Sequence, residues 1–438
     1  MTEKRKAALH NLGCKVNSYE TEAMQELLEK AGYEIVPFAP GADVYVINTC
    51  TVTNMADRKS RQMLHKAKKM NPHAVVVAAG CYVQASREEA EQDEAIDIII
   101  GNNQKKDLVK ILAQYEKSCQ EQVCVEDLTH NREYEQLNIT HTTEHTRAYI
   151  KVQDGCNQFC SYCIIPYTRG RVRSRAMDEV LTEIKGLAET GFQEVVLTGI
   201  HLSSYGVDNG SSLLELILKI HEIEGIKRIR LGSLEPGIIT QEFVHTLKGK
   251  EKFCPHFHLS LQSGCNATLK RMNRHYSAEE YYEKCCLLRE NFEHPALTTD
   301  VIVGFPGETE EEFTETVEFL KKVSFYETHI FKYSRRKGTR ADRMENQIPE
   351  PIKTKRSEVL LTLDKVNRGL FEKQIVGTEV EVLFEEKVTI DGQEWFVGHT
   401  KEYVKVAVTT EEDLGNQLRK VLISGEKVGD LCRAKIIP

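Results

Sequence analysis

Three cysteines in the segment DGCNQFCSYC have the spacing of a metal-cluster loop. Cys156, Cys160 and Cys163 follow a Cys-x3-Cys-x2-Cys pattern, which gathers three thiolates within one short loop. A structural zinc site and a ferredoxin-type cluster both take four protein ligands. Three thiolates on a 4Fe-4S cluster leave one iron open, and that iron can chelate a small molecule. The alternative is a zinc site that a distant Cys or His completes.

A second group of three cysteines is spread over the first 100 residues. Cys14, Cys50 and Cys81 each follow an apolar run that is typical of a buried strand, in NLGCKVN, VINTCTVTN and VVVAAGCYV. The carboxyl ends of parallel strands meet at one edge of an open α/β sheet, where ligands bind. We therefore expect the three thiols to converge on a second cluster. The alternative is that they are buried structural cysteines, because Cys often packs as a small hydrophobe.

The remaining seven of the 13 cysteines show no ligand spacing and are expected to be structural. They are Cys119, Cys124, Cys254, Cys265, Cys285, Cys286 and Cys432.

The elements that position the two cysteine groups predict a multidomain α/β protein. Alternating apolar runs and helical segments up to residue 128 predict an N-terminal open α/β domain. Residues 129–146 are polar and aperiodic, as in a linker. Residues 147–373 contain six strand–helix units and a helical bridge, which predicts a partial (β/α)6 barrel with its site at the carboxyl ends of the strands. Five short apolar runs in residues 374–438 predict a small β-barrel.

Within these domains the sequence predicts the following strands and helices. Strands are expected at 7–12, 44–48, 74–80, 96–100, 148–153, 194–198, 228–232, 256–262, 297–303 and 328–333. Helices are expected at 18–30, 55–70, 178–190, 212–223, 241–248, 278–291, 310–323 and 356–374.

Composition sets limits on the class of protein. The 438 residues include 58 Lys and Arg and 66 Asp and Glu, a formal charge of −8, which argues against a protein that coats nucleic acid through bulk positive charge. No apolar run reaches the roughly 18 residues of a membrane span, and the N-terminus has no secretory pattern. An odd number of cysteines without an export signal indicates reduced thiols. We therefore expect a cytoplasmic protein that does not enter a membrane.

Seven segments resemble the radical S-adenosylmethionine (SAM) methylthiotransferases. They occur in the order typical of that family, over residues 4–436: GCKVN, NTCTVT, DGCNQFCSYCIIPYTRGRVRSR, LTGIHLSSYG, LSLQSGCNATLKRMNR, DVIVGFPGETEEEF and FKYSRRKGTRA. The C-terminal β segment is similar to the TRAM domain, an RNA-binding barrel. The forms of Gly13–Asn17 and Asn48–Thr53 resemble most closely the branch that acts on N6-threonylcarbamoyladenosine in tRNA. The isopentenyladenosine branch tends to have Gln after the first cysteine, and the ribosomal-protein branch has GCPKN.

The resemblance implies a radical reaction at carbon-2 of the modified adenine, with two SAM molecules consumed per turnover. Cys156, Cys160 and Cys163 would hold the SAM-binding 4Fe-4S cluster. Cys14, Cys50 and Cys81 would hold an auxiliary 4Fe-4S cluster that carries the sulfur. No catalytic side chain is expected beyond these ligands. The resemblance also implies an external one-electron donor, such as a flavodoxin-like protein. It does not identify the molecule that donates the sulfur.

Loop residues at the strand ends are expected to contact SAM: Gly199, Ser233, Gln262, Gly304 and Gly307. Basic residues beside the first cysteine loop and in FKYSRRKGTRA are expected to contact RNA phosphates. They are Arg169, Arg171, Arg173, Arg175, Arg335, Arg336, Lys337 and Arg340. The FKYSRRKGTRA segment departs from the commoner family form, in which prolines stand where this chain adds charge.

Two other functions remain open at this point. The same chemistry could act on isopentenyladenosine in tRNA or on a ribosomal protein side chain. A function of another class is a non-catalytic iron–sulfur RNA-binding protein, although a structural or electron-transfer cluster would normally take a fourth protein ligand.

Overall fold

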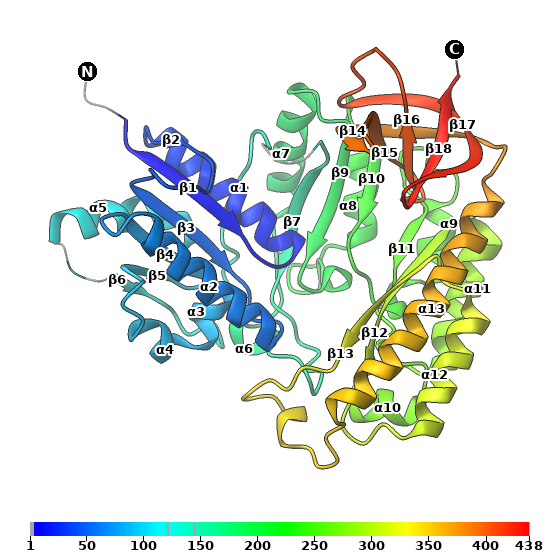
Figure 1. Ribbon diagram of the computed structural model, residues 1–438, viewed down its shortest axis with the longest axis horizontal. Helices are drawn as coiled ribbons and strands as arrows, with labels where there is room; N and C mark the ends of the chain where they lie inside the picture. The colour runs from blue at the N-terminus through cyan, green and yellow to red at the C-terminus, as the bar shows by residue number, and fades with distance from the viewer. Residues whose placement is uncertain (1–3, 119, 121, 143–145, 438) are drawn as a thin grey trace.

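The computed structural model describes residues 4–118, 120, 122–142 and 146–437 of the chain. Cys119 and residues 143–145 of the expected linker lie outside the described residues. Figure 1 shows an N-terminal α/β layer structure, a central curved sheet backed by helices, and a small β-barrel that contains the C-terminus. The expected multidomain α/β fold is confirmed.

The N-terminal domain is a parallel six-stranded sheet with helices on both faces. Its strand order is β2-β1-β3-β4-β5-β6. The strands are β1 (Lys6–Asn11), β2 (Glu34–Ile35), β3 (Val44–Thr49), β4 (Val75–Gly80), β5 (Ile98–Ile100) and β6 (Gln122–Cys124). The helices are α1 (Lys15–Lys30), α2 (Asn54–Met70), α3 (Cys81–Ala85), α4 (Arg87–Glu91) and α5 (Leu108–Ser118). Strands β3 and β4 are buried along their whole length, as expected for inner strands of a parallel sheet.

Helix α1 packs on two sheets at once. Met24 and Leu28 lie in the core between α1, α5 and the N-terminal sheet. Tyr19 and Ala23, on another side of the same helix, belong to the core of the central domain. The two domains are therefore joined by one helix that contributes to the apolar core of each.

The segment between these domains has irregular backbone in its described part. Leu137 and Ile139 are nevertheless buried in the core of the central domain, and the Tyr19 hydroxyl donates to the Leu137 carbonyl. The segment is thus packed along the seam between the two domains.

The central domain is a partial barrel of six parallel strands. One sheet has the order β10-β9-β7-β8, another has the order β11-β12-β13, and isolated bridges from Ile229 to Phe253 and from Leu234 to Leu259 join them. The six parallel strands are β7 (Ala148–Asp154), β9 (Glu194–Gly199), β10 (Arg228–Leu231), β11 (His256–His258), β12 (Ala296–Val303) and β13 (Glu327–Lys332), and the short β8 (Arg173–Ser174) pairs antiparallel with β7.

The helices of the central domain cover the outer face of the curved sheet. They are α7 (Met177–Glu189), α8 (Leu213–His221), α9 (Gln241–Leu247), α10 (Asn266–Arg271), α11 (Ala278–Asn291), α12 (Glu310–Val323) and the long α13 (Glu350–Gln374), whereas the short α6 (Ile165–Thr168) lies against α3 of the N-terminal domain. In β12, Leu297, Val301 and Val303 pack in the apolar core, so Thr298, Asp300 and Ile302 point to the opposite, inner face.

The C-terminal domain is a closed five-stranded barrel in the order β14-β15-β16-β18-β17. Its strands are β14 (Glu379–Ile390), β15 (Gln393–Thr400), β16 (Lys405–Val408), β17 (Gln417–Val428) and β18 (Leu431–Ile436). Two buried arginines of β10 attach it to the central domain: Arg228 donates to the carbonyl oxygen of His399 at 2.8 Å, and Arg230 donates to that of Lys401 at 2.8 Å.

The structure differs from the sequence-based elements in a few places. The expected strand 256–262 is regular only over His256–His258, and beyond it Leu259 and Gln262 form only isolated bridges, with Gln262 at a left-handed φ of 69°. Helix α5 and strand β6 were not anticipated from the sequence. No described helix is long and apolar enough to cross a bilayer.

Candidate active site

The Cys156–Cys163 loop begins directly after β7, at the carboxyl end of the first barrel strand. Gly155, which precedes it, has φ 71°, and a Cβ at this position would lie 1.9 Å from the carbonyl oxygen of Arg171. Only glycine fits here, because the returning chain crosses directly over its backbone. The crossing also allows the Cys156 amide to donate to the Gly170 carbonyl at 3.0 Å.

The segment that follows α10 holds the outer side of this loop. The Asn273 side chain donates to the carbonyl oxygens of Gln158 and Phe159, both at 3.2 Å, and the Ser161 hydroxyl donates to the Arg271 carbonyl at 2.8 Å. The conformation of the cysteine loop is therefore fixed by the RMNR sequence of another segment.

The three thiols of this loop lie in a partly buried site with positive neighbours. Burial raises the pKa of Cys156 to about 11 and that of Cys163 to about 12. Arg274 donates to the Cys160 sulfur at 3.2 Å, and its guanidinium also lies 2.9 Å from Glu235. Metal binding deprotonates such thiols, and N–H groups aimed at the sulfur stabilise the resulting thiolates.

The second group of thiols converges as the sheet topology predicts. Strands β1, β3 and β4 are neighbours in the sheet, and Cys14, Cys50 and Cys81 follow their carboxyl ends. Burial raises the pKa of Cys50 to about 11, and both Cys81 and Cys14 contribute to that increase. The three sulfurs are therefore electrostatic neighbours. A Cβ on Gly13 would lie 2.9 Å from the Cys50 sulfur, so glycine leaves the space between Cys14 and Cys50 open.

Arg169 lies between the two cysteine groups. Its Nε donates to the Cys81 sulfur at 3.2 Å, and its Nη1 donates to Glu20 at 2.8 Å and to Asp154 at 3.2 Å. Lys151 bridges the same two carboxylates, at 2.8 Å from Glu20 and 2.7 Å from Asp154. We call Glu20, Asp154, Lys151 and Arg169 the buried charge network.

Electrostatics explains why this network is stable in the interior. Burial alone would raise the pKa of Asp154, but Lys151, Arg169 and Arg173 lower it below its usual range. Burial opposes ionisation of Glu20 in the same way, and Arg169, Lys105 and Lys151 hold its pKa well below normal. Both carboxylates are therefore ionised and paired at neutral pH.

The donor set of both cysteine groups fits an iron–sulfur cluster better than a single metal ion. Among the described residues, the only His, Cys, Asp and Glu side chains whose ligand atoms all lie within 4.8 Å of one another are His258, Asp300 and His329. Neither cysteine group meets that distance. Thiolates on one zinc ion stand about 2.3 Å from the metal and hence close together, whereas several irons spread their ligands further apart.

Four of the eight arginines and lysines expected to contact RNA are buried, so that part of the prediction is wrong. Arg169 and Arg173 are 0% and 1% exposed and surround Asp154, and Arg175 pairs with Glu183 at 2.5 Å. Arg336 is held in the interior by Asp57. The other four are exposed: Arg171, Arg335, Lys337 and Arg340.

An open groove of about 720 Å³ is lined by residues that follow Cys50, Cys81 and Cys163 closely in the sequence. It runs between α3–α4 of the N-terminal domain and the segments around Ile164 and Lys337, and Arg61, Arg87 and Tyr167 also line it. A second groove of about 500 Å³ shares Tyr167 and Gly338 with it and adds Arg340 and Arg343. Tyr167 is 55% exposed, which is unusual for a large aromatic side chain.

The residues expected to contact SAM all lie at the carboxyl ends of barrel strands. Gly199 ends β9, Ser233 and Gln262 follow β10 and β11, and Gly304 and Gly307 follow β12. Gly304 also has a structural reason to be glycine, because a Cβ there would lie 2.3 Å from the Lys353 side chain. Their role toward SAM stays a prediction.

Two family models match the chain. Residues 6–101 match the Uncharacterized protein family UPF0004, and residues 150–320 match the Radical SAM superfamily. The threonylcarbamoyladenosine tRNA methylthiotransferase MtaB of Bacillus subtilis is 42% identical over 419 residues, which cover 95% of this chain and 93% of the relative. The chain belongs to the radical SAM methylthiotransferase family. It is therefore a transferase of a family that uses SAM and iron–sulfur clusters, and the non-catalytic alternative is not supported.

Further relatives and a solved structure agree with this placement. The MtaB protein of Aquifex aeolicus is 43% identical, covering 86% of this methylthiotransferase and 92% of the relative. The tRNA-2-methylthio-N(6)-dimethylallyladenosine synthase of Acetivibrio thermocellus is 34% identical, and the match covers 98% of this chain and 90% of the relative. The solved radical SAM methyltransferase TsrM from Kitasatospora setae shares the fold, with a TM-score of 0.56, 15% identity, and coverage of 75% of this chain and 72% of that one.

The sequence did not reveal several residues that organise the site of this methylthiotransferase. Arg274, Glu235 and Asn273 act on the cysteine loop from other segments. Asn273 and Arg274 lie within the segment LSLQSGCNATLKRMNR, but nothing in the sequence assigned this role to any of the three. Lys15 and His329 were also overlooked, because nothing in the sequence brings them to one face of the barrel.

Proposed function

We propose that this enzyme transfers a methylthio group to carbon-2 of N6-threonylcarbamoyladenosine next to the anticodon of tRNA. The observation that carries the proposal is the 42% identity to the B. subtilis relative of that name, at nearly full length of both chains. The relative named for dimethylallyladenosine is less similar, at 34% identity.

Cys156, Cys160 and Cys163 are the proposed ligands of the SAM-binding 4Fe-4S cluster, and Cys14, Cys50 and Cys81 those of the auxiliary one. When bound, the two clusters and two SAM molecules per turnover supply the radical and the sulfur that an unactivated aromatic C–H bond requires. Arg274 and Arg169 are proposed to stabilise one thiolate in each group through their N–H donors. Gly199, Ser233, Gln262, Gly304 and Gly307 remain the proposed contacts of SAM.

The groove lined by Tyr167 and Lys337 is the proposed entrance for the anticodon loop. Arg171, Arg335, Lys337 and Arg340 are exposed and positively charged, which suits RNA phosphates. Tyr167 offers an exposed ring on which a base can stack. The C-terminal barrel is proposed to be a TRAM-type RNA-binding module. A flavodoxin-like one-electron donor and a cytoplasmic location complete the proposal.

Deletion of the gene followed by mass spectrometry of digested tRNA tests the substrate. We expect 2-methylthio-N6-threonylcarbamoyladenosine to disappear, its precursor without the methylthio group to accumulate, and a plasmid copy to restore it. Loss of only the isopentenyl product would overturn the substrate assignment.

A further inference from the structure

Lys15 directly follows Cys14, and its ammonium group lies within electrostatic range of residues of the two other domains. Its electrostatic neighbours are Tyr403, Arg147, Arg230 and Asp300. Asp300 lies on the inner face of β12, and Arg230 is buried at the base of β10. The lysine side chain therefore reaches from the loop of the auxiliary thiols toward the inner face of the barrel.

Among the charged groups that the structure describes in this neighbourhood, Lys15 is the one without a direct ion pair. Arg147 pairs with Glu385 at 3.1 Å, Arg230 pairs with Glu194 at 2.7 Å, and Asp300 pairs with His258 at 3.2 Å. No hydrogen bond or ion pair within 4 Å joins the Lys15 ammonium to any residue that the structure describes. Asp300 is the carboxylate that acts on Lys15 electrostatically, but its direct pair is with His258, so the half-buried ammonium has room for the negative charge of a ligand.

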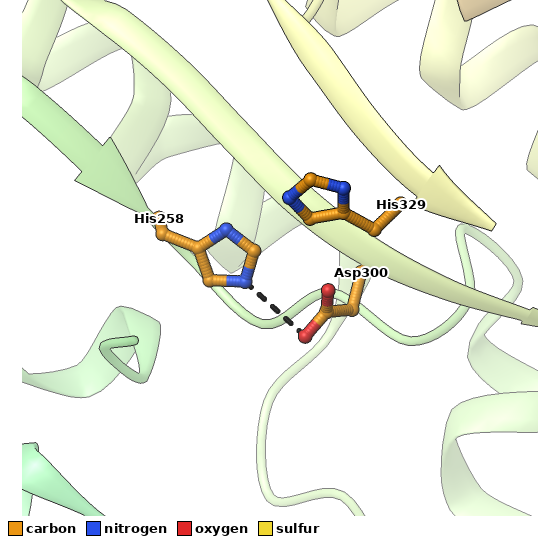
Figure 2. A group of neighbouring side chains, drawn as sticks. All are labelled: His258, Asp300 and His329. Carbon is orange, nitrogen blue, oxygen red and sulfur yellow. Dashed lines mark ion pairs between the residues drawn. The ribbon is translucent and has the colours of Figure 1, made fainter. Parts of the chain in front are cut away.

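Asp300 belongs to a group of polar side chains on three neighbouring strands. Figure 2 shows His258 of β11, Asp300 of β12 and His329 of β13 turned toward one another, with an ion pair between His258 and Asp300. The Thr298 hydroxyl lies 3.0 Å from Nδ1 of His258 and orients that ring. His329 is exposed and stacks on His258, at 5.5 Å between ring centroids.

We propose that Lys15 binds the carboxylate of the N6 substituent of the target adenosine and thereby selects a threonylcarbamoyl group over an apolar one. This inference rests on the proposed function. His329 and Asp300 are proposed to meet the other polar atoms of the substituent, as hydrogen-bond donor and acceptor. Lys15 is in this view a specificity-determining residue and takes no part in the chemistry at carbon-2.

The geometry of adenine agrees with this placement. Carbon-2 and the N6 group lie on the same edge of the ring, separated only by N1 and carbon-6. A residue that reads the N6 substituent must therefore lie close to the reacting carbon and to the sulfur it receives. Lys15 satisfies that condition because it is adjacent in sequence to Cys14.

The His258, Asp300 and His329 group also has the ligand composition of a transition-metal site. We favour substrate binding because Lys15 also acts on Asp300, and a cation beside the group opposes the binding of a metal cation. The two possibilities differ in a measurable way, and metal binding is therefore one outcome of the test.

The test measures the affinity of the reconstituted holoenzyme for three anticodon stem–loop RNAs of one sequence. One carries N6-threonylcarbamoyladenosine, one carries the same group with its carboxylate blocked as a methyl ester, and one carries plain adenosine. We expect the wild-type enzyme to bind the first RNA about ten to a hundred times more tightly than the other two, as for a charge-assisted hydrogen bond. Equal affinity for the first two RNAs would overturn the role of the carboxylate without any variant.

Variants of Lys15 test whether this residue causes the preference for the free carboxylate. Lys15→Met should remove the preference for the free carboxylate and leave the affinity for plain RNA unchanged, and Lys15→Arg should keep much of the preference. The control is Lys185→Met, because Lys185 is exposed on α7 and far along the chain from the site. Iron content must equal that of the wild type. Loss of affinity for all three RNAs alike would indicate a phosphate contact and overturn the proposal.

Two further results separate this inference from the function on which it rests. If the wild-type enzyme forms the methylthio product but Lys15→Met keeps its full preference, the lysine proposal fails and the function stands. If the wild-type enzyme neither prefers nor modifies threonylcarbamoyladenosine, the proposed function fails. Stoichiometric Mn²⁺ binding to the holoenzyme, seen by electron paramagnetic resonance and lost in His329→Ala, would overturn the substrate role in favour of a metal site.

Discussion

Arg169 donates its Nε–H to the sulfur of Cys81 at 3.2 Å, across the boundary between the two larger domains. The arginine belongs to the barrel and follows the first cysteine loop by six residues, whereas the cysteine begins α3 of the N-terminal domain. The same guanidinium holds Glu20 and Asp154. One side chain thus couples the proposed auxiliary cluster, the strand before the SAM loop and the interface between them.

Replacement of Arg169 by Met should destabilise the protein strongly. Glu20 and Asp154 would lose a partner in the interior, which typically costs about 3–5 kcal/mol. Chemical unfolding of the cluster-free protein measures this loss. Arg171→Met is the control, since Arg171 is exposed and stacks on Phe159 at 4.6 Å, and we expect a change below about 1 kcal/mol. Similar effects of the two variants would contradict the structural role of Arg169.

The two cysteine groups should lose iron independently. We expect about eight irons per chain after anaerobic reconstitution, as for two 4Fe-4S clusters, and about four after Cys156, Cys160 and Cys163 are all changed to Ala. The matched variant replaces Cys14, Cys50 and Cys81 and should also leave about four. A control triple replacement of Cys254, Cys285 and Cys432 should retain the full complement. Full retention in either of the first two variants would rule out that ligand set.

Gly155→Ala should abolish the SAM-loop cluster. The added methyl group would lie 1.9 Å from the Arg171 carbonyl oxygen, in addition to the strain of a positive φ. Gly191→Ala is the matched control, because Gly191 has φ 98° but no atom within 4 Å of an added Cβ. It carries only the backbone strain, about 1–3 kcal/mol. We expect about four irons in the first variant and about eight in the second. Equal iron content in the two variants would contradict this prediction, because it would mean that the backbone at Arg171 moves to make room for the added methyl group.

Acid should weaken the buried charge network. Arginine and lysine neighbours hold the pKa of Glu20 and of Asp154 below the usual values of about 4.3 and 3.9. The unfolded chain therefore takes up protons at a higher pH than the folded one. The stability they contribute is fully present above those usual values and is lost as the pH falls toward the lowered ones.

Urea unfolding of the cluster-free protein between pH 3 and 7 measures this effect. We expect the midpoint of the wild-type protein to fall steeply below about pH 4. Glu20→Gln should be less stable at neutral pH and show a shallower dependence on acid. If the unfolding midpoint of Glu20→Gln fell with pH as steeply as that of the wild type, Glu20 would not contribute to the acid sensitivity of the protein.

The dependence of RNA affinity on salt concentration should show whether the groove contacts RNA phosphates. Lys337→Ala and Arg340→Ala should each reduce the slope of log affinity against log salt by about 0.7–0.9, as for one phosphate contact. Lys185→Ala on the exposed face of α7 should leave the slope unchanged. Unchanged slopes for both groove variants would place the RNA elsewhere.

Much of the architecture could be predicted because it follows local patterns. The continuous β-branched runs before Cys50 and Cys81 identify inner strands of a parallel sheet, and that topology alone brings the thiols to one edge. The arginines show where such reasoning fails. Positions 169, 173 and 175 look like a basic surface in the sequence, but they meet Glu20, Asp154 and Glu183. The Glu20 contact spans 149 residues, and only the tertiary fold reveals it.

The shared core of helix α1 has a consequence for how substrate enters. Met24 and Leu28 fasten the helix to one sheet, and Tyr19 and Ala23 fasten it to the other, so the first domain cannot swing open as a lid without exposing both cores. The distance between the two sulfur-rich loops is therefore a fixed dimension of the enzyme. The RNA has to make the adjustment: its adenosine must flip out of the stacked anticodon loop to reach a rigid gap.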